Sequence, residues 1–423
     1  MKYAVKGDII YSKNYRELHE YKNSYVICED GYSKGVYKKL PRKYENIKIY
    51  DYTGHLITPG LCDLHLHAPQ YAFVGMHMDL ELIDWLNNYT FKEESKYNNL
   101  SYAKKAYDLF INDLRKSPTT RYSLFATLHK EATKYLFDIA EKSGLKGYIG
   151  KVNQDRNNIK ILNETTKDSI HDTLEIIEYT KKFKNTKYII TPRFIPSCTD
   201  ELLNKLSLIA KEKNLPIQSH LSENRDEIKW VKELVKKSKS YAHAYSLFNM
   251  LGNQTNTIMA HCVWPEKIDF DLLKNNKVWV AHSPSSNRNL SSGIAPIRKY
   301  INNGIKVGLA TDVAGGSYLS MFRAIEDMIT SSKIRYAMID KLNKAICFAE
   351  AFYCATIGGG SFFGKVGSFD KGYEFDLLVL DESKIPTVLI KDLTLIERLE
   401  RFVYRPNDTL VAKFVAGKKI SLK

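Results

Sequence analysis

Two histidines separated by one residue, His65 and His67, are the first side chains whose types and spacing suggest chemistry. They close an apolar stretch that begins at Leu61, and Pro69 follows them, as is typical of a buried strand and its end. Alternate side chains of a strand point to the same side, so both imidazoles would project together from its carboxyl end. Two imidazoles in that position suit one metal ion. The same pattern also fits a strand with two hydrogen-bonded histidines, so this motif alone is not decisive.

Four later stretches with strand-like composition also end on a residue that can bind metal or transfer a proton. These residues are His220, His261, His282 and Asp312, and Glu223 follows His220 by three positions. In a barrel of parallel strands the carboxyl ends meet on one face, where catalytic sites are found. Five of the 11 histidines lie at strand ends of this kind, so the sequence predicts one shared site.

Each of these later residues also has a purely structural interpretation. His220 could be a hydrogen-bonded core histidine, and His261 could serve either as a ligand or as a catalytic group. His282 precedes a turn-like loop that it could brace, Asp312 could cap the next helix, and Glu223 could be a surface acid. Their convergence on one face favours a metal site with acid–base groups beside it.

The elements that would position these residues lie in the middle of the chain, where short β-branched runs alternate with helical patterns. The clearest helix covers 199–210, with Thr199 as its N-cap and acidic residues in its first turn. Together with the strand that ends at His67, the predicted strands number about eight, as in a (β/α)8 barrel. An open doubly wound sheet is the second choice, because no G-x-G-x-x-G opens a helix. The later predicted strands are 122–127, 146–152, 187–194, 215–220, 257–262, 277–282 and 305–312.

Short strand patterns occur again at both ends of the chain. They predict an α/β protein in which a TIM-type barrel carries a small β-sandwich domain built from both chain termini. The predicted division is 1–58 for the first part of the β-domain, 59–366 for the barrel and 367–423 for the second part of the β-domain.

Composition restricts the location and the partners of the protein. The six cysteines show no C-x-x-C spacing, which is typical of reduced thiols in the cytoplasm. The N-terminus lacks the apolar core of a signal peptide, and no run of about 18 apolar residues predicts a membrane span. The net charge of +15 could serve a nucleic-acid partner, but the lysines are scattered and form no cluster of five. We therefore expect a small-molecule substrate, with no nucleic-acid and no membrane partner.

Several motifs together resemble the amidohydrolase superfamily, specifically its aminohydrolase branch, and most closely the members that deaminate guanine. The resemblance covers nearly the whole chain. It implies zinc-dependent hydrolysis of guanine to xanthine and ammonia, as in purine catabolism and salvage. The Gln70, Trp85-Leu86 and Arg193-Phe194 elements point to guanine, while the metal motif marks the superfamily. The matching stretches are 59–70, 84–91, 192–194, 219–223, 282–287, 311–316, 358–361 and 367–380.

Carried over by position, the resemblance implies one Zn²⁺ per chain, with Fe²⁺ as the alternative, and a homodimer. The ion would be held by His65, His67, His220 and Asp312. Substrate would be bound by Gln70, Trp85, Leu86, Arg193, Phe194 and His282. The catalytic residues would be Glu223, His261 and Asp312. Glu223 would protonate the ring nitrogen beside the attacked carbon.

Four other functions remain open from the sequence. The first is deamination of another ring, such as a modified purine, a pterin or cytosine. The second is ring-amide hydrolysis by a two-metal relative. Such a relative normally has a carboxylated lysine on the fourth strand, where this sequence has Arg193. Lys151 is at the end of the third strand, which is the wrong place for that role. The third is a non-catalytic scaffold of this fold, which the complete ligand set disfavours. The last is salt-sensitive RNA binding.

Overall fold

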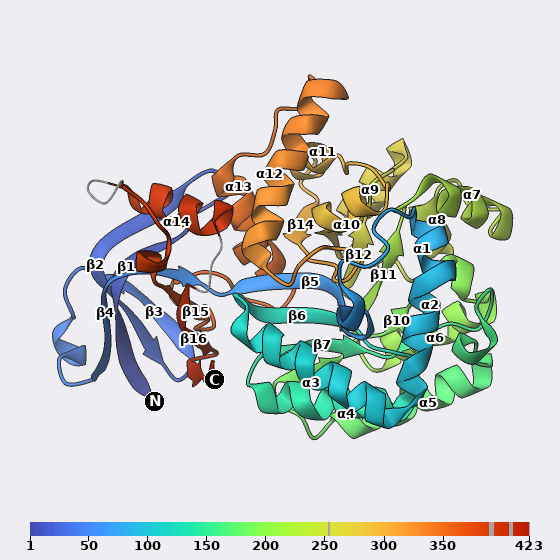
Figure 1. Cartoon of the computed structure of the whole chain (residues 1–423), viewed down its shortest axis with the longest axis horizontal. Helices are drawn as coiled ribbons and strands as arrows, with labels where there is room; N and C mark the ends of the chain where they lie inside the picture. Colours follow the sequence, from blue (N-terminus) through green and yellow to red (C-terminus); the bar gives the residue numbers. More distant parts are fainter. Residues whose placement is uncertain (253, 389–392, 406–408, 423) are drawn as a thin grey trace.

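The computed structural model describes residues 1–252, 254–388, 393–405 and 409–422. Figure 1 shows a closed barrel of strands ringed by helices and, beside it, a strand-rich sheet that holds both ends of the chain. None of the helices in these described ranges has the length and apolar content needed to cross a membrane.

The sheet beside the barrel is built from both chain ends. Its seven strands are ordered β17-β16-β15-β4-β1-β2-β3. The first and last parts of the chain meet where β4 pairs antiparallel with β15, with Leu56 opposite Leu380. The strands are β1 (Lys2–Ser12), β2 (Leu18–Glu29), β3 (Tyr32–Tyr37), β4 (Lys48–Pro59), β15 (Leu377–Leu380), β16 (Leu410–Val415) and β17 (Lys418–Ile420). The expected β part made from both termini is confirmed.

The barrel consists of two four-stranded parallel sheets, ordered β5-β6-β7-β9 and β11-β12-β13-β14. On one side an isolated bridge from Ile190 to Ile217 joins them. On the other side the Asp312 amide donates to the His65 carbonyl (2.9 Å), and the His67 amide donates to the Val313 carbonyl (3.0 Å). The predicted (β/α)8 barrel is therefore confirmed. The barrel strands are β5 (Leu61–His67), β6 (Thr119–Phe125), β7 (Lys146–Gly150), β9 (Thr186–Tyr188), β11 (Ile217–Leu221), β12 (Thr257–His261), β13 (Val278–His282) and β14 (Lys306–Leu309).

The fourth barrel strand differs from the expected 187–194. It is interrupted between β9 and β10 (Thr191–Pro192), and β10 pairs with β8 (Val152–Asn153). Thr191 Oγ1 donates to the Ile189 carbonyl (3.0 Å), and Pro192 has no amide hydrogen to offer a neighbouring strand. The predicted strand therefore forms two short strands, β9 and β10. Arg193 and Phe194 follow β10 and lie outside both strands.

Helices surround the barrel in the expected alternation. In α6 (Asp200–Glu212), Thr199 caps the amino end by accepting from the Leu202 amide (3.2 Å), and Leu202, Leu203 and Leu206 are buried. The other helices are α3 (Leu100–Lys116), α4 (Lys130–Ser143), α5 (Thr166–Thr180), α7 (Arg225–Leu234), α8 (Tyr241–Leu247), α9 (Lys267–Asn275), α10 (Pro284–Asn289), α11 (Ile297–Asn302), α12 (Met321–Met338), α13 (Phe348–Tyr353) and α14 (Leu395–Tyr404). Short helical segments are η1 (Arg42–Tyr44), η2 (Ala68–Phe73), α1 (Leu82–Trp85), η3 (Leu86–Thr90), α2 (Phe91–Ser95), η4 (Lys96–Asn98), η5 (Lys160–Leu162), η6 (Ile195–Ser197), η7 (Cys354–Gly358) and η8 (Glu382–Lys384).

A buried ion pair ties the barrel to the sheet. Arg121 on β6 donates from Nε and Nη2 to the two oxygens of Asp376 (2.5 and 2.8 Å) and from Nη2 to Glu374 (3.0 Å). Asp376 lies just before β15, and its side chain is fully buried. Removing one partner of such a pair leaves an uncompensated buried charge.

Arg121→Met is expected to lower the free energy of unfolding by about 3–5 kcal/mol, because Asp376 then loses its counter-charge. Denaturant unfolding measures this change. Arg16→Met is the matched control, since Arg16 is exposed and should move the same quantity by less than about 0.5 kcal/mol. Equal effects of the two variants would refute a stabilising role for the buried pair.

Candidate metal centre and active site

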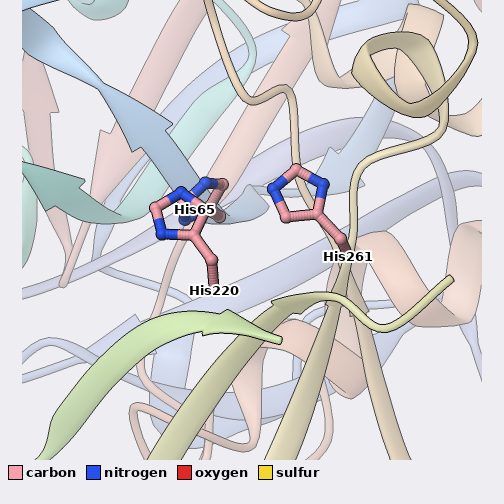
Figure 2. A group of neighbouring side chains, drawn as sticks. All are labelled: His65, His220 and His261. Atoms are coloured by element: carbon pink, nitrogen blue, oxygen red, sulfur yellow. The ribbon is translucent and has the colours of Figure 1, made fainter. Parts of the chain in front are cut away.

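Four side chains predicted as metal ligands gather at the carboxyl end of the barrel. His67 Nε2 lies 3.1 Å from His220 Nε2, and His65 Nε2 lies 3.0 Å from Asp312 Oδ1. The distance from His67 Nε2 to Asp312 Oδ1 is 3.7 Å. They come from β5, β11 and the segment after β14, so the barrel alone brings them together. In Figure 2 the rings of His65 and His220 overlap in the view, with His261 next to them; the centres of the His65 and His220 rings are 4.7 Å apart and the two planes are at 89°.

The chemistry of this cluster fits a divalent metal ion. The side chains of His65, His67 and Asp312 are buried, at most 7% exposed, and His220 is part-buried. Burial lowers the pKa of His65, His67 and His220, so their imidazoles are neutral and carry lone pairs. Nδ1 of His65 has no hydrogen-bond partner among the described residues, and Nε2 faces Asp312 Oδ1 at 3.0 Å. Three neutral imidazoles and one carboxylate, buried and facing one another, are a donor set that suits Zn²⁺.

Hydrogen bonds behind the cluster hold two imidazoles in orientation. His220 Nδ1 lies 2.6 Å from the Arg193 carbonyl oxygen, and His261 Nδ1 lies 2.9 Å from Asn287 Oδ1. In both rings the partner of Nδ1 is an oxygen acceptor, so Nδ1 carries the proton and Nε2 is left to face the centre.

Asp63 forms hydrogen bonds between the first barrel strand and the segment that carries Asp312. This fully buried carboxylate accepts from the Thr311 amide (3.0 Å) and from Thr311 Oγ1 (2.5 Å). It thereby links β5, which carries the two neighbouring histidines, to the segment that carries Asp312. The relative position of ligands from the first and last barrel strands depends on this contact.

A pocket opens beside the cluster, with about 450 Å³ of space between its lining atoms, open solvent included. Most of the predicted substrate-binding residues line it, and the acidic and histidine groups form its floor. The lining includes Gln70, Trp85, Leu86, Arg193, Phe194, His67, His220, Glu223, His261 and Asp312.

Comparison with known proteins identifies the family. Residues 56–420 match the Amidohydrolase family. This chain belongs to that family. The guanine deaminase of Dictyostelium discoideum is 35% identical over 444 residues, covering 98% of this chain and 97% of the relative. The human guanine deaminase is 38% identical over 330 residues, covering 76% and 72%.

Solved structures agree with these relatives. The crystal structure of guanine deaminase from C. acetobutylicum, with guanine bound in its active site, is 46% identical to this amidohydrolase. It superposes with a TM-score of 0.96 and covers 100% of both chains. The E. coli guanine deaminase is 28% identical with a TM-score of 0.90, covering 99% of each chain.

Two carboxyl groups of this amidohydrolase differ in their proton affinity. Burial raises the pKa of Glu223 well above its usual value, and the neighbouring charges of Asp312 and Glu227 raise it further. Burial would also raise the pKa of Asp312, but the facing His65 and His261 rings and the hydrogen bonds from His65 and Ser286 lower it below its usual value. His261 Nε2 lies between the pair, 3.3 Å from Glu223 Oε2 and 3.7 Å from Asp312 Oδ2. The two carboxyl groups on either side of this imidazole therefore have pKa values shifted in opposite directions.

The loop of Glu223 is itself fixed by buried groups. Glu227 accepts from the Glu223 amide (3.0 Å) and from the Tyr241 hydroxyl (2.7 Å). Ser292 Oγ donates to Glu223 Oε1 (3.4 Å). These three supporting residues belong to no recognisable spacing in the sequence and were not predicted from it.

His282 is the predicted site residue that the structure places apart. It is 2% exposed at the end of β13, and it is not among the described residues that line the cavity. Burial, together with His261 and Arg288, lowers its pKa to about 3. Its predicted contact with substrate stays a prediction.

Sequence reasoning also missed Glu94, which contacts both Gln70 and Arg193. In the sequence it follows Lys92 and Glu93 and precedes Ser95, a pattern typical of a solvent-exposed helix face. In the structure its side chain is only 7% exposed. No local signal distinguishes it from its neighbour Glu93.

Proposed function

We propose that this amidohydrolase hydrolyses guanine to xanthine and ammonia. The observation that carries the proposal is one cavity that combines the metal-type cluster with Gln70, Arg193 and Phe194. The guanine deaminases that resemble this chain over nearly its whole length support the same conclusion.

The metal is proposed to be one Zn²⁺ per chain, with Fe²⁺ as the alternative, held by His65, His67, His220 and Asp312. When bound, the ion supplies a water molecule whose pKa falls from about 15.7 to near 7. The burial of His65, His67 and Asp312 and the orientation of His220 by the Arg193 carbonyl support this assignment.

The residues around the cluster divide the proton transfers. Asp312 is ionised and accepts the proton from the attacking water. His261 orients that water and stabilises the charge that develops at the attacked ring carbon. Glu223 begins protonated and donates that proton to the ring nitrogen beside that carbon. It then takes up the proton that Asp312 removed from the water and passes it to the departing ammonia. The hydroxyl formed at the attacked carbon returns its proton to Glu223 as it becomes the carbonyl of xanthine.

Recognition of the base is assigned to the other wall of the cavity. Gln70 and Arg193 hydrogen-bond the purine edge, Phe194 packs on the ring, and Trp85 and Leu86 close the pocket. Arg193 is a fixed donor, so a carbonyl oxygen satisfies it and an amino group does not. Adenine therefore leaves buried donors facing one another, which costs about 1–3 kcal/mol for each unsatisfied group.

Purified, metal-loaded protein is expected to convert guanine to xanthine and to act on adenine at least about a hundredfold more slowly. Absorbance of xanthine and release of ammonia measure the two reactions. Cytosine, a pterin and a modified purine complete the panel. Equal turnover of adenine, or turnover of a different base alone, would overturn the proposed substrate.

A cytoplasmic homodimer completes the proposal. The six cysteines are unpaired in the described ranges of the chain, which suits a reducing compartment. The homodimer rests on the family resemblance. Light scattering of the purified protein determines its mass in solution.

A further inference from the structure

Glu94 lies behind the cavity wall that is assigned to base recognition. Its Oε1 accepts from Gln70 Nε2 (2.8 Å) and from Arg193 Nη2 (3.1 Å), and its Oε2 accepts from Arg193 Nη1 (2.6 Å). All three side chains are buried. One carboxylate therefore holds both of the residues proposed to read the purine edge, and it holds them next to each other through a shared oxygen.

The contact with Glu94 determines which way the Gln70 amide is turned. An ionised carboxylate can only accept hydrogen bonds, so the partner at 2.8 Å must be the amide nitrogen of Gln70. The amide oxygen is consequently held on the other side of the group. Because Gln70 lines the cavity, this oxygen is the acceptor that it offers to a ligand.

Glu94 binds the edge of the Arg193 guanidinium, and Phe91 lies against its face. Both terminal nitrogens bind Glu94, and the guanidinium carbon lies 5.0 Å from the centre of the Phe91 ring. Phe91 and Glu94 are three residues apart on α2, so they lie on the same helix face. The remaining N–H groups of Arg193 are donors in a fixed position.

An acceptor from Gln70 beside donors from Arg193 matches a ring that carries an N–H next to a carbonyl. Guanine and hypoxanthine have this edge, whereas adenine has the reverse, an unprotonated nitrogen next to an amino group. A glutamine free to turn over could accommodate part of either pattern. With Glu94 behind it, turning Gln70 would place the amide oxygen against a carboxylate, which is repulsive.

We infer that Glu94 is a positioning residue that sets this donor–acceptor order and so selects N–H/carbonyl edges over the adenine-like reverse. The inference rests on the proposed function and deepens it, since it names the class of ring that the same site accepts. Glu94 acts through Gln70 and Arg193 and lines no part of the cavity itself.

The metal cluster is anchored independently of Glu94. His220 is oriented by the backbone carbonyl of Arg193, not by its side chain. Loss of the Glu94 charge is therefore expected to change base recognition and to leave the metal content unchanged. This separation distinguishes a positioning role from a general structural one.

The test compares Glu94→Gln with Glu93→Gln on the same helix. Glu93 pairs with Lys96 (2.5 Å) and contacts neither Gln70 nor Arg193, so its variant is the matched control. Calorimetry measures Kd for hypoxanthine, which has the N–H/carbonyl edge but no amino group to lose, and for adenine. Metal analysis and thermal unfolding accompany each titration.

The wild type and Glu93→Gln are expected to bind hypoxanthine at least about tenfold more tightly than adenine. Glu94→Gln should weaken hypoxanthine by about tenfold or more and reduce this preference, with full metal content. For guanine, KM should rise more than kcat falls. An unchanged preference in folded, metal-loaded Glu94→Gln, or a wild type with no preference for hypoxanthine, overturns the inference.

A double variant, Gln70→Glu with Glu94→Gln, keeps the test decisive if Glu94→Gln does not fold. It preserves the net charge beside Arg193 and again presents an acceptor oxygen at position 70. The double variant should bind hypoxanthine more tightly than adenine, as the wild type is expected to do. A folded double variant that binds the two bases equally would count against the inference. Because binding needs no turnover, a wild type that binds hypoxanthine but leaves guanine intact would contradict the proposed function alone.

Discussion

Replacing Glu223 with Gln is expected to lower kcat for guanine by about 10²–10⁴-fold while metal content stays full. Burial, followed by the nearby Asp312 and Glu227, raises the pKa of the Glu223 carboxyl, and the proton that this favours is the one proposed to reach the ring. Glutamine retains the size and the hydrogen-bonding ability of the side chain but cannot give up a proton. Xanthine formation under saturating guanine, with metal analysis of the same sample, measures the effect.

Glu233→Gln is the control for this variant, since Glu233 is exposed on α7, ten residues further along the same segment of chain. It should deaminate guanine at the wild-type rate. Near-normal kcat in metal-replete Glu223→Gln would remove Glu223 from proton transfer. A fall in metal content would instead assign it to the support of the cluster.

Loss of the metal is expected to abolish guanine deamination, and His220→Ala should lose the metal even when Zn²⁺ is supplied. His220 Nε2 lies 3.1 Å from His67 Nε2, so removing one imidazole breaks the four-ligand set. Dialysis against a chelator, followed by titration with Zn²⁺ or Fe²⁺, measures turnover against metal bound. Recovery should be complete near one ion per chain.

His171→Ala is the matched control for metal binding. His171, Asp172 and Glu175 also form a metal-competent group on α5, but His171 is 73% exposed. Both carboxylates are also paired with Lys130. This variant should keep full metal content and activity. Metal retained in His220→Ala, or one of two bound ions lost in His171→Ala, would contradict the single buried centre.

The barrel could be predicted from local sequence because its strands are short apolar runs that end on polar side chains. This pattern located seven later strands within a few residues of β6, β7, β9, β11, β12, β13 and β14. The interruption between Tyr188 and Thr191 was not foreseen, since it depends on where Thr191 and Pro192 meet neighbouring strands. The predicted division at 1–58, 59–366 and 367–423 stays a prediction.

The candidate site was predictable to the extent that its residues lie at strand ends. His65, His67, His220 and Asp312 could be grouped in advance because parallel strands deliver their carboxyl ends to one face. Glu94 could not, because it comes from a short helix outside the alternating pattern and resembles its part-buried neighbour Glu93 in sequence. His282 is the opposite case. It ends β13, as the sequence predicted, but it is not among the described residues that line the cavity.

The sequence by itself determined the ligand types, the strands that carry them and the resemblance to a family, because these depend on residue identity and short-range periodicity. Only the tertiary structure decided in which direction the pKa of each acid shifts, since burial and the groups facing each carboxyl set the two shifts. Only the tertiary structure placed Glu94 against Gln70 and Arg193. The direction of a side-chain amide depends on the group behind it, and that group comes from a distant part of the chain.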